Sequence, residues 1–575
     1  MNLLSDYQIK IHNFLKKLND KKVIFIPNNL QSLTIELPPK NNQADISCNA
    51  ALILSKFNKK EPIVLAEILK EKFIENFKEF GKIDIAKPGF ININFTPKFW
   101  KKYLSKILIF NKKYGSNKNI KKKYNIEFVS ANPTGPLHVG HCRGAILGDV
   151  ISNLLKFNGH YVLKEYYVND YGQQINTFVF SVYYRILELV NNKKFPNDKN
   201  LYPGEYIVDI AKKIIKEKKI KNFTNLEKIL KKLSKESLKI SIGIIKNNLK
   251  DLGIKHDKFV YESDLVSKGL VNKTVNKLKK NKYVYTGKLK PPKGDINEEW
   301  KIREQLLFRS TKFGDDVDRA LQKEDNTWTY FASDIAYHDH KLKRNFDFLI
   351  NILGSDHAGY IKRITAVVNA LSKNKINLTC KVSQLVKLYK DGLPFKMSKR
   401  EGNYITVEDL IKEVGKDSTR FMMLNRSNDV ELDFDFQKVT EKSKDNPVFY
   451  VQYAYARINS IFRNLKLNIN KKMKLEKEQF LLNEYEINIL KKIAEWPRCV
   501  EVSSNKLEPH RIPFFLYDLA VLFHSYWSLG KDNKNYRFIS ESGKSNIIRL
   551  SLLQAMAIVI KNGMSILGVT TPKSM

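Results

Sequence analysis

Residues 130–141 read Ser-Ala-Asn-Pro-Thr-Gly-Pro-Leu-His-Val-Gly-His and join a predicted strand to a predicted helix. Residues 124–129, before them, alternate polar and apolar side chains as a half-buried strand does, and residues 143–157 form a helical run. The start of a helix presents backbone N–H groups and a positive dipole end, which bind anions. His138 and His141 lie three residues apart, so both rings can reach one phosphate chain. We therefore expect this stretch, the first signature, to hold ATP.

A second stretch far downstream, residues 395–400, reads Phe-Lys-Met-Ser-Lys-Arg, and we call it the second signature. Lysine pairs are common in this chain, so the spacing alone would fit a solvated surface run equally well. The flanks are more specific, because residues 391–394 predict a turn and Thr406 opens a capping box for the next helix. When the α-phosphate of ATP is attacked, charge builds on the departing pyrophosphate, and ammonium groups stabilise that transition state. We expect Lys396 and Lys399 to supply those ammonium groups.

The two signatures resemble those of class I aminoacyl-tRNA synthetases, usually written HIGH and KMSKS. Further segments narrow the resemblance to the arginyl-tRNA synthetases. They are Tyr-Tyr-Val-Asn-Asp-Tyr-Gly-Gln-Gln from Tyr166, Tyr-Pro-Gly-Glu-Tyr-Ile from Tyr202, Lys-Phe-Gly-Asp-Asp-Val-Asp-Arg from Lys312, Thr-Tyr-Phe-Ala-Ser-Asp-Ile-Ala-Tyr-His from Thr329, and Asn-Pro-Val-Phe-Tyr-Val-Gln-Tyr-Ala-Tyr-Ala-Arg-Ile from Asn446. The resemblance runs from about residue 45 to the C-terminus. It implies a ligase that forms arginyl-adenylate from ATP and L-arginine, then transfers arginine to tRNA(Arg).

The pattern of strands and helices divides the 575 residues into three parts, and we expect an α/β protein. Residues 1–120 mix helices with short β-rich pieces and resemble the family's additional N-terminal tRNA-binding domain. Residues 121–440 alternate strands and helices as a Rossmann-type parallel sheet does, with a largely helical insertion around 178–264. Residues 441–575 are predicted to be almost wholly helical and resemble the family's anticodon-binding bundle.

The predicted ATP site draws on a further segment, Gly-Ser-Asp-His at residues 354–357. It follows the apolar strand 348–353, so it lies at the carboxyl end of a strand, where ligands bind in open α/β sheets. The family often has a second histidine where this chain has Ala358, and that contact is left unassigned. The resemblance implies that ATP, with Mg²⁺ as part of the substrate, is bound by His138, Gly140, His141, Gly354, Asp356, Met397 and Lys399. The catalytic residues among the signatures are His138, His141, Lys396 and Lys399.

Acidic residues near the sheet predict the choice of amino acid. A planar guanidinium with five donors matches paired carboxylates such as Glu127 and Asp334, whereas lysine would leave acceptors unpaired. Without the resemblance, these carboxylates would more simply balance nearby lysines or cap a helix. The resemblance implies that arginine is bound by Glu127, Ser130, Asn132, His141, Tyr330 and Asp334. No separate editing domain is expected, since polar discrimination of a guanidinium is strong.

A net charge of +40 and a sequence pI near 9.7 suit a polyanionic partner such as tRNA. Lysine and asparagine are abundant throughout, so biased composition explains the charge equally well. In the predicted helix after Asn446, Tyr450 and Tyr453 share a face, which favours core packing. Tyr455 is then the better candidate for stacking on RNA. The predicted tRNA-binding residues are Tyr455, Arg457 and Met575, while Lys573 and Ser574 depart from the family's C-terminal tail.

The four cysteines, Cys48, Cys142, Cys380 and Cys499, are not spaced as metal ligands, so we expect neither structural zinc nor disulfides. A metal site built from His338, Asp339, His340, Asp356 and His357 is an alternative that we disfavour. No uninterrupted apolar run is long enough to span a membrane, and the first 22 residues do not read as a signal peptide. We expect a cytoplasmic enzyme, acting as a monomer.

Two other functions stay open at this point. The first is another class I synthetase with glutamyl or cysteinyl specificity, although a cysteinyl enzyme would need a cysteine cluster for zinc. The second is a catalytically silent RNA-binding relative of the synthetases. Intact histidines and lysines in both signatures argue against silence.

Overall fold

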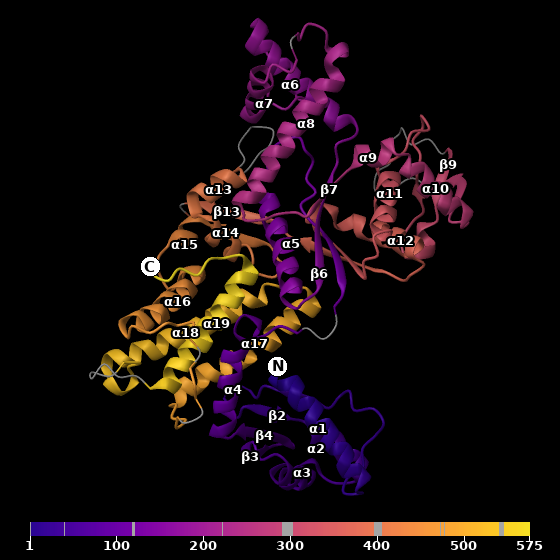
Figure 1. The fold of residues 1–575 in the computed structure, drawn as a ribbon. Coiled ribbons are helices and arrows are strands. Elements are labelled where there is room, and N and C mark those ends of the chain that lie inside the picture. The colour runs from indigo at the N-terminus through magenta and orange to yellow at the C-terminus, as the bar shows by residue number, and fades with distance from the viewer. Residues whose placement is uncertain are drawn as a thin grey trace. The chain divides into compact units, whose positions relative to one another are not determined.

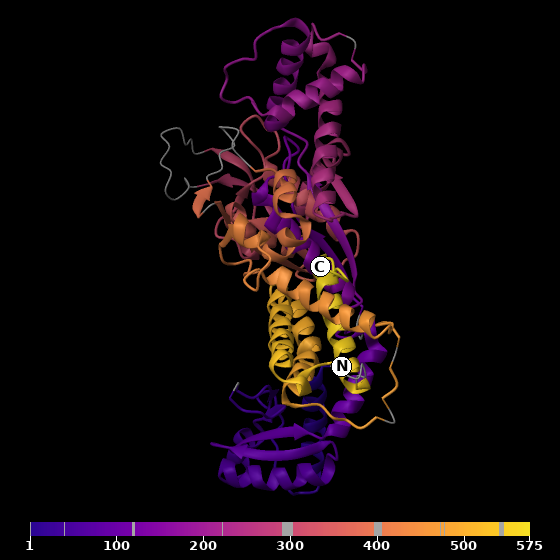
Figure 2. The same ribbon diagram turned by 90° about the vertical axis from the view of Figure 1, so that its left-hand side faces the viewer.

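A computed structural model describes most of the chain (Figures 1 and 2). The described residues are 2–39, 41–117, 121–220, 222–289, 303–390, 392–395, 405–471, 473–475, 478–539 and 546–575. The chain forms two compact units. One comprises Met1–Asn117 with Lys442–Met575, and the other comprises Lys118–Glu441.

The unit Lys118–Glu441 is built on a five-stranded sheet in which all neighbouring strands are parallel. In spatial order the strands are β12 (Asn377–Ser383), β11 (Phe348–Gly354), β5 (Lys123–Glu127), β6 (Tyr161–Val168) and β7 (Lys258–Tyr261). The strand order reverses between β11 and β5, and ligands bind beyond the carboxyl ends of the strands at such a point. The Rossmann-type sheet predicted from the sequence is confirmed.

Helix α5 (Val139–Phe157) follows the first signature and packs against β6 and β11 (Figure 1). Gly148 permits this close approach, because a Cβ atom at that position would overlap the ring of Phe128 at the end of β5. Helices α11 (Tyr330–Leu342) and α12 (Ile361–Ser372) flank the strand β11, and the 3-10 helix η3 (Ser355–Tyr360) joins β11 to α12. The residues that follow β5 and β11 are therefore held at one edge of the sheet.

Three helices follow β6 and precede β7 in the sequence, and they pack on one another (Figure 1). They are α6 (Gln173–Asn191), α7 (Glu205–Lys216) and α8 (Leu226–Asp251). Their shared core includes Phe178, Val182, Ile186, Ile207, Ile210 and Leu233. The insertion expected around 178–264 thus begins earlier in the structure, and its last residues include the sheet strand β7. A four-residue strand is too short to show a clear alternation in sequence.

The rest of this unit comprises two small three-stranded sheets, in the orders β10-β9-β8 and β14-β13-β15, and short helices. The elements are α9 (Glu262–Ser267), α10 (Leu270–Lys280), β8 (Val284–Lys288), β9 (Glu304–Phe308), the 3-10 helix η2 (Ser310–Phe313), β10 (Arg319–Ala320), β13 (Val386–Lys390), β14 (Leu393–Phe395), α13 (Val407–Val414), α14 (Lys416–Met422), β15 (Leu432–Asp435) and α15 (Phe436–Thr440).

The other unit combines a small α/β part with a helical bundle, as predicted. The α/β part has an antiparallel sheet in the order β1-β2-β4-β3, with helices packed on it (Figure 2). Its elements are α1 (Leu3–Asp20), β1 (Ile35–Glu36), β2 (Ile46–Cys48), α2 (Ala50–Asn58), α3 (Pro62–Asn76), β3 (Phe80–Ala86), β4 (Phe90–Phe95), α4 (Pro97–Phe110) and the 3-10 helix η1 (Asn111–Lys113). The bundle consists of α16 (Pro447–Asn464), α17 (Glu484–Lys506), α18 (Arg511–Asp532), the 3-10 helix η4 (Lys534–Tyr536) and α19 (Ile547–Leu567).

The N-terminal and C-terminal segments of the chain contact each other within this unit. The indole Nε1 of Trp496 donates to the carbonyl of Tyr114 at 3.1 Å, and the Tyr114 hydroxyl donates to the carbonyl of Ile493 at 3.0 Å. Asp45 pairs with Lys491 at 2.6 Å. Of the described helices, α19 alone has the length and composition to cross a membrane, and 89% of that stretch is buried in the structure.

Candidate active site

The first signature begins with a strained turn. Val129 has φ +71°, and the N–H of Ser130 donates to the carbonyl of Phe128 at 3.1 Å, which is the pattern of a γ-turn with positive φ. A β-branched residue rarely adopts this conformation, so its surroundings must hold it. The Ser130 hydroxyl does so by donating to Glu127 Oε1 at 3.1 Å and accepting from the Tyr167 N–H at 3.0 Å. The turn is thereby fixed to both β5 and β6.

Side chains from β6 and the helical insertion fix the rest of the first signature. The Tyr166 hydroxyl donates to the carbonyl of Ala131 at 2.8 Å. Further along, the N–H of Leu137 donates to the side-chain oxygen of Asn248 in α8 at 3.0 Å, and Asn248 is buried. The insertion therefore helps to position the predicted phosphate-binding turn.

The two signature histidines form the start of α5. His138 is the N-cap and its Nδ1 accepts from the N–H of Gly140 at 3.1 Å, while Nδ1 of His141 accepts from the N–H of His138 at 3.3 Å. With Nδ1 accepting, a neutral ring carries its proton on Nε2, which can donate to an anion. The ring centroids lie 4.0 Å apart. A Cβ atom at Gly140 would lie 2.9 Å from the His138 ring, so this glycine also makes room for the histidine.

The predicted residues of the second signature, Lys396, Met397 and Lys399, lie outside the described residues. Its flanks are described: β13 and β14 form a hairpin around Gly392, and Thr406 forms the predicted capping box with Asp409. After the signature, Ile405 and Val407 exchange backbone hydrogen bonds with the first signature. The N–H of Val139 donates to Ile405 at 3.1 Å and the N–H of Val407 donates to Leu137 at 2.9 Å. Residues 405–407, which follow the second signature, are thus tied to the first signature at one edge of the sheet.

The segment after β11 completes that edge. β11 is hydrogen-bonded to β5 in parallel, so Gly354 lies at the same end of the sheet as the first signature. Asp356 exposes 78% of its side chain, and His357 Nε2 lies 3.5 Å from its carboxylate. Ala358 is exposed as well. Asp356 is therefore accessible to a ligand, as its predicted contact with ATP requires.

A pair of acidic side chains, Asp334 and Glu262, lies near this edge. Asp334 lies one turn into α11 and Glu262 begins α9 after β7. Burial raises the pKa of Asp334 to about 7, helped by the negative charges of Glu127 and Glu262, while a hydrogen bond from Tyr360 opposes the rise. Burial, helped by the charge of Asp170, raises the pKa of Glu262 to about 7 as well. Two nearby carboxyls that titrate near neutrality are suited to binding a cation.

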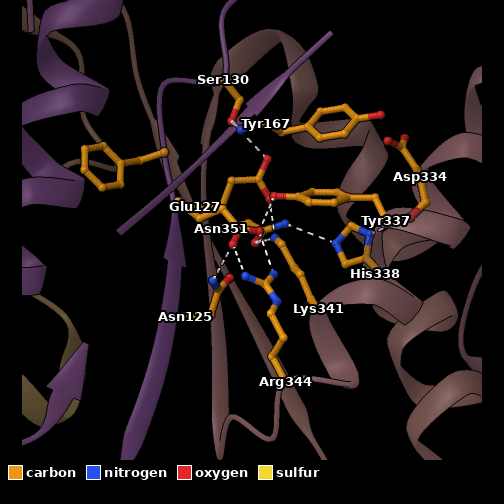
Figure 3. Close-up of polar contacts among 12 residues, drawn as sticks. Asn125, Glu127, Ser130, Tyr167, Asp334, Tyr337, His338, Lys341, Arg344 and Asn351 are labelled. Carbon is orange, nitrogen blue, oxygen red and sulfur yellow. Dashed lines mark hydrogen bonds and ion pairs between the residues drawn. The ribbon is translucent and has the colours of Figure 1, made fainter. Parts of the chain in front are cut away.

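Glu127, predicted to pair with Asp334, has a cation of its own within the protein (Figure 3). Lys341 is fully buried, and its ammonium group donates to Glu127 Oε2 and, at 3.1 Å, to Asn351 Oδ1. Glu262, the other carboxyl near Asp334, has no ion-pair partner among the described residues. Sequence reasoning missed Glu262, although its place just after a short strand marks the carboxyl edge of the sheet.

A second ion pair joins Arg344, labelled in Figure 3, to Glu165 on β6. Glu165 on β6 is fully buried and receives both guanidinium nitrogens of Arg344, with a further hydrogen bond from the Tyr337 hydroxyl at 2.8 Å. Asn125 Nδ2 also donates to Glu165 at 3.2 Å. Burial alone would raise the pKa of Glu165, but Arg344 and Lys341 hold it below its usual value. Both carboxylate oxygens of Glu165 therefore accept hydrogen bonds from Arg344, as a buried charge requires, while Nε of Arg344 is buried without a partner.

Asn132 and Tyr330, both predicted to bind arginine, meet the start of α6. Asn132 Nδ2 donates to Gln174 Oε1 at 2.6 Å. Tyr330 is 53% exposed, and its hydroxyl oxygen would lie 3.1 Å from a Cβ atom at Gly172. The structure therefore brings both residues to the start of α6.

The disfavoured metal cluster has structural partners instead. His338 is buried and its Nδ1–H donates to the carbonyl of Asp334 at 2.8 Å, while burial lowers its pKa to about 3. Asp339 pairs with Lys277 and Lys343, each at 2.6 Å. Within the described parts of the chain, no group of three or more His, Cys, Asp or Glu side chains is arranged to hold a metal ion.

The prediction that Tyr455 is free to stack on RNA is wrong, because its side chain is only 5% exposed. Tyr455 lies on the same helix face as the buried Val451, Ile458 and Phe462, and a spacing of three to four residues could have shown this in the sequence.

Arg457 is placed differently from Tyr455. Its guanidinium lies 4.2 Å from the ring centroid of Tyr453 and 5.0 Å from that of Trp527, and its Nη2 donates to the Tyr453 hydroxyl at 2.8 Å. Met575 is 55% exposed. The nearby tail is held by its backbone, since Arg463 donates to the carbonyl of Lys573 at 2.6 Å. The unusual side chain of Lys573 is therefore compatible with this contact.

Three family models match the chain. The model described as the arginyl tRNA synthetase N terminal domain matches residues 5–95. The model for the catalytic domain of tRNA synthetases class I (R) matches residues 103–463, and the DALR anticodon binding domain matches residues 451–575.

Known proteins resemble the chain over its whole length. The arginine–tRNA ligase of Pelagibacter ubique is 58% identical over 577 aligned residues, and that of Allorhizobium ampelinum is 41% identical over 585; both alignments cover 100% of each chain. The solved structure of Thermus thermophilus arginyl-tRNA synthetase matches with a TM-score of 0.72 at 18% identity, also covering 100% of each chain. This last comparison bears on the fold.

Proposed function

The chain belongs to the arginyl-tRNA synthetases, and on that premise we propose how its residues carry out the family's reaction. Arginyl-tRNA synthetases activate L-arginine with ATP and transfer it to tRNA(Arg), releasing pyrophosphate and AMP. The other functions considered from the sequence, a different class I specificity and a silent RNA-binding relative, are set aside by this membership. The roles of individual residues and the limits of the domains are the proposal.

ATP is bound at the carboxyl edge of the sheet between β5 and β11. His138 and His141 donate from Nε2 to the phosphates, Gly140 leaves space beside them, and Gly354 and Asp356 contact the ribose. Met397 and Lys399 join them from the second signature. Mg²⁺ enters with ATP and offsets phosphate charge.

In the first step, an oxygen of the arginine carboxylate attacks the α-phosphorus, and the bond to the bridging oxygen of pyrophosphate breaks. Lys396 and Lys399 stabilise the charge that develops on the departing pyrophosphate. In the second step, a terminal adenosine hydroxyl of tRNA attacks the arginyl carbonyl and AMP departs. No covalent enzyme intermediate is required.

Arginine is selected by the acidic pair Asp334 and Glu262 near the carboxyl edge of the sheet, and this pair is the observation that carries the proposal. Asp334 and Glu262 face the guanidinium, whose planar set of donors matches two carboxylates better than a lysine ammonium does. Tyr330 contacts the bound arginine beside them. Ser130, Asn132 and His141 lie on the first signature, between the guanidinium pocket and the phosphates, and suit the amino-acid end of the substrate. Glu127 stays bound to Lys341 and supports that end through Ser130.

The outer parts of the chain serve tRNA. We propose residues 1–120 as the additional tRNA-binding domain, 121–440 as the catalytic domain and 441–575 as the anticodon-binding domain; the three matched models follow one another in the same order and support this division. Arg457 and Met575 are accessible positions for RNA contact in the bundle. We further propose a cytoplasmic monomer without zinc of its own, since Cys48, Cys142, Cys380 and Cys499 lie on separate elements.

Charging of total tRNA with each radiolabelled amino acid in turn tests the proposal. Arginine alone should become attached to tRNA in the presence of ATP and Mg²⁺. Attachment of glutamate or cysteine would contradict the specificity. The Asp334→Asn variant should lose arginine charging in the same assay, with Asp316→Asn, an exposed carboxylate paired with Lys362, as the control.

A further inference from the structure

Tyr360 joins the two halves of the site. It is the last residue of η3, which follows β11 and carries Asp356, and its hydroxyl donates to Asp334 Oδ2 on α11. The phenol ring is half-buried, meeting Phe331 edge-on at 6.4 Å between centroids. The Arg363 guanidinium lies 5.5 Å from its centre. The hydroxyl is therefore held in place from more than one side.

The groups around Asp334 act on its charge in opposite directions. They are Tyr360 of η3, Glu127 of β5, Glu262 of α9, Tyr167 of β6, and His338 and Lys341 of α11 itself. Burial and the two carboxylates favour the neutral acid, whereas Tyr360 and Lys341 favour the anion. Lys341 is already bound to Glu127. Among the described residues, Tyr360 is the one side chain that donates a hydrogen bond to the Asp334 carboxylate.

We propose that Tyr360 is a positioning residue for arginine recognition, whose hydroxyl keeps Asp334 ionised and orients its carboxylate toward the guanidinium. The inference rests on the proposed role of Asp334 in binding arginine. A neutral carboxylic acid would present no charge to the guanidinium and would direct an O–H toward a group that only donates. Because the hydrogen bond from Tyr360 holds the Asp334 carboxylate in place, the Tyr360 hydroxyl on η3 affects the affinity for arginine, which Asp334 on α11 binds.

Calorimetric titration of Tyr360→Phe with L-arginine from pH 6 to pH 9 tests this role. Removing a hydrogen bond that favours the anion raises the pKa of Asp334 above its present value of about 7. If that rise is about one pH unit, arginine binds about ninefold more weakly than to the unchanged enzyme at pH 6 and about fivefold more weakly at pH 7, since one unit is a factor of ten only well below both pKa values. The difference should shrink toward pH 9, where both enzymes have Asp334 ionised.

A matched variant, Tyr285→Phe, controls for the loss of a tyrosine hydroxyl. Tyr285 donates to Asp318 at 2.8 Å in the small sheet, so it forms the same kind of bond outside the site. Its pH profile for arginine should match that of the unchanged enzyme. A Tyr360→Phe profile that also matches would overturn the inference. One lowered by the same factor at every pH would overturn the part in which the hydroxyl keeps Asp334 ionised, because packing and orientation alone give no dependence on pH.

Asp334→Asn separates this inference from the proposed function. If that variant binds arginine normally, Asp334 is not the recognition residue and both proposals fall. If it binds arginine weakly while Tyr360→Phe behaves like the unchanged enzyme, only the role of Tyr360 falls. When Asp334→Asn is combined with Tyr360→Phe, the second substitution should add no pH dependence, because the titrating carboxyl is gone.

Discussion

The backbone N–H of Val139 donates a hydrogen bond to the carbonyl of Ile405 at 3.1 Å. Val139 lies within the first signature, and Ile405 is the first described residue after the second. The helix start that is proposed to hold the phosphates and the chain at Ile405 therefore share one backbone ladder. Such a link fixes Ile405 beside the proposed ATP site.

We predict that Lys399→Ala slows adenylate formation by about 2 to 4 kcal/mol in transition-state stabilisation and changes arginine affinity little. The lysine acts on charge that develops as pyrophosphate departs, so ground-state binding of arginine does not involve it. Pre-steady-state kinetics measure the step directly. Lys412→Ala, an exposed lysine of α13 paired with Glu408, is the control and should react at the normal rate. An equally normal rate for Lys399→Ala would remove that residue from the mechanism.

We predict that Asp334→Asn and Glu262→Gln each weaken arginine binding by about 1.5 to 3 kcal/mol and leave ATP binding intact. Each change keeps the shape of the side chain and removes one charge from a charge-assisted hydrogen bond. Calorimetry with arginine and with ATP checks both parts. Normal arginine binding by Glu262→Gln, with a loss in Asp334→Asn, would return the second carboxylate role to Glu127.

Arginine binding should weaken as the pH falls through 7. The pKa values of Asp334 and Glu262 are both raised to about 7, and the guanidinium stays protonated throughout. Each carboxyl that must lose a proton before binding contributes about a tenfold loss per pH unit below its pKa. In the unliganded enzyme the same two groups bind protons more tightly when folded, so their contribution to stability rises as the pH falls through 7. Melting curves with and without arginine should therefore converge toward pH 6, and curves that stay equally far apart would contradict the assignment.

Lys341→Met should destabilise the fold by about 3 to 5 kcal/mol, because it leaves Glu127 without its buried cation. Urea unfolding measures the loss. Lys343→Met removes a mostly exposed lysine from the same helix and should cost far less. Combining Lys341→Met with Glu127→Gln should recover part of the stability. No recovery would mean that packing of the lysine, not its charge, accounts for the effect.

Local patterns predicted the elements well and contacts across the sheet poorly. The capping box at Thr406 and the strand before Gly354 depend on neighbouring residues, and the structure contains both. The pairing of Lys341 with Glu127 joins α11 to β5, and no local periodicity specifies it. Local periodicity does not predict the positive φ of Val129 either, since the sequence favours an extended valine there.

Two site residues show the same limit in different ways. Glu262 follows β7, which has only four residues and shows no clear alternation in the sequence. The neighbouring tyrosines favour Tyr455 as the exposed ring, whereas the apolar positions of α16 place it on the buried face. The position of Glu262 depends on the three-dimensional sheet, whereas that of Tyr455 follows from helical spacing alone.

The final prediction concerns the order of events. Arginyl-tRNA synthetases typically need tRNA before they activate arginine, and the proposed tRNA-binding parts at the two ends of this chain form one compact unit. Bound tRNA can favour a closed arrangement over ATP only if it binds that arrangement more tightly than the open one.

We expect arginine-dependent exchange between ATP and pyrophosphate to be near background without tRNA, and to appear when periodate-oxidised cognate tRNA is added. The oxidised tRNA cannot accept arginine, so exchange restored by it reports on the arrangement of the site and not on turnover. Oxidised tRNA of another specificity is the control and should restore little, because it lacks the contacts that favour the closed arrangement. The backbone bond between Val139 and Ile405 already ties the chain after the second signature to the proposed phosphate-binding turn, which argues for partial closure by the protein itself. Full exchange in a rigorously RNA-free preparation would show that this closure suffices without tRNA, and the assignment to the family would be unaffected.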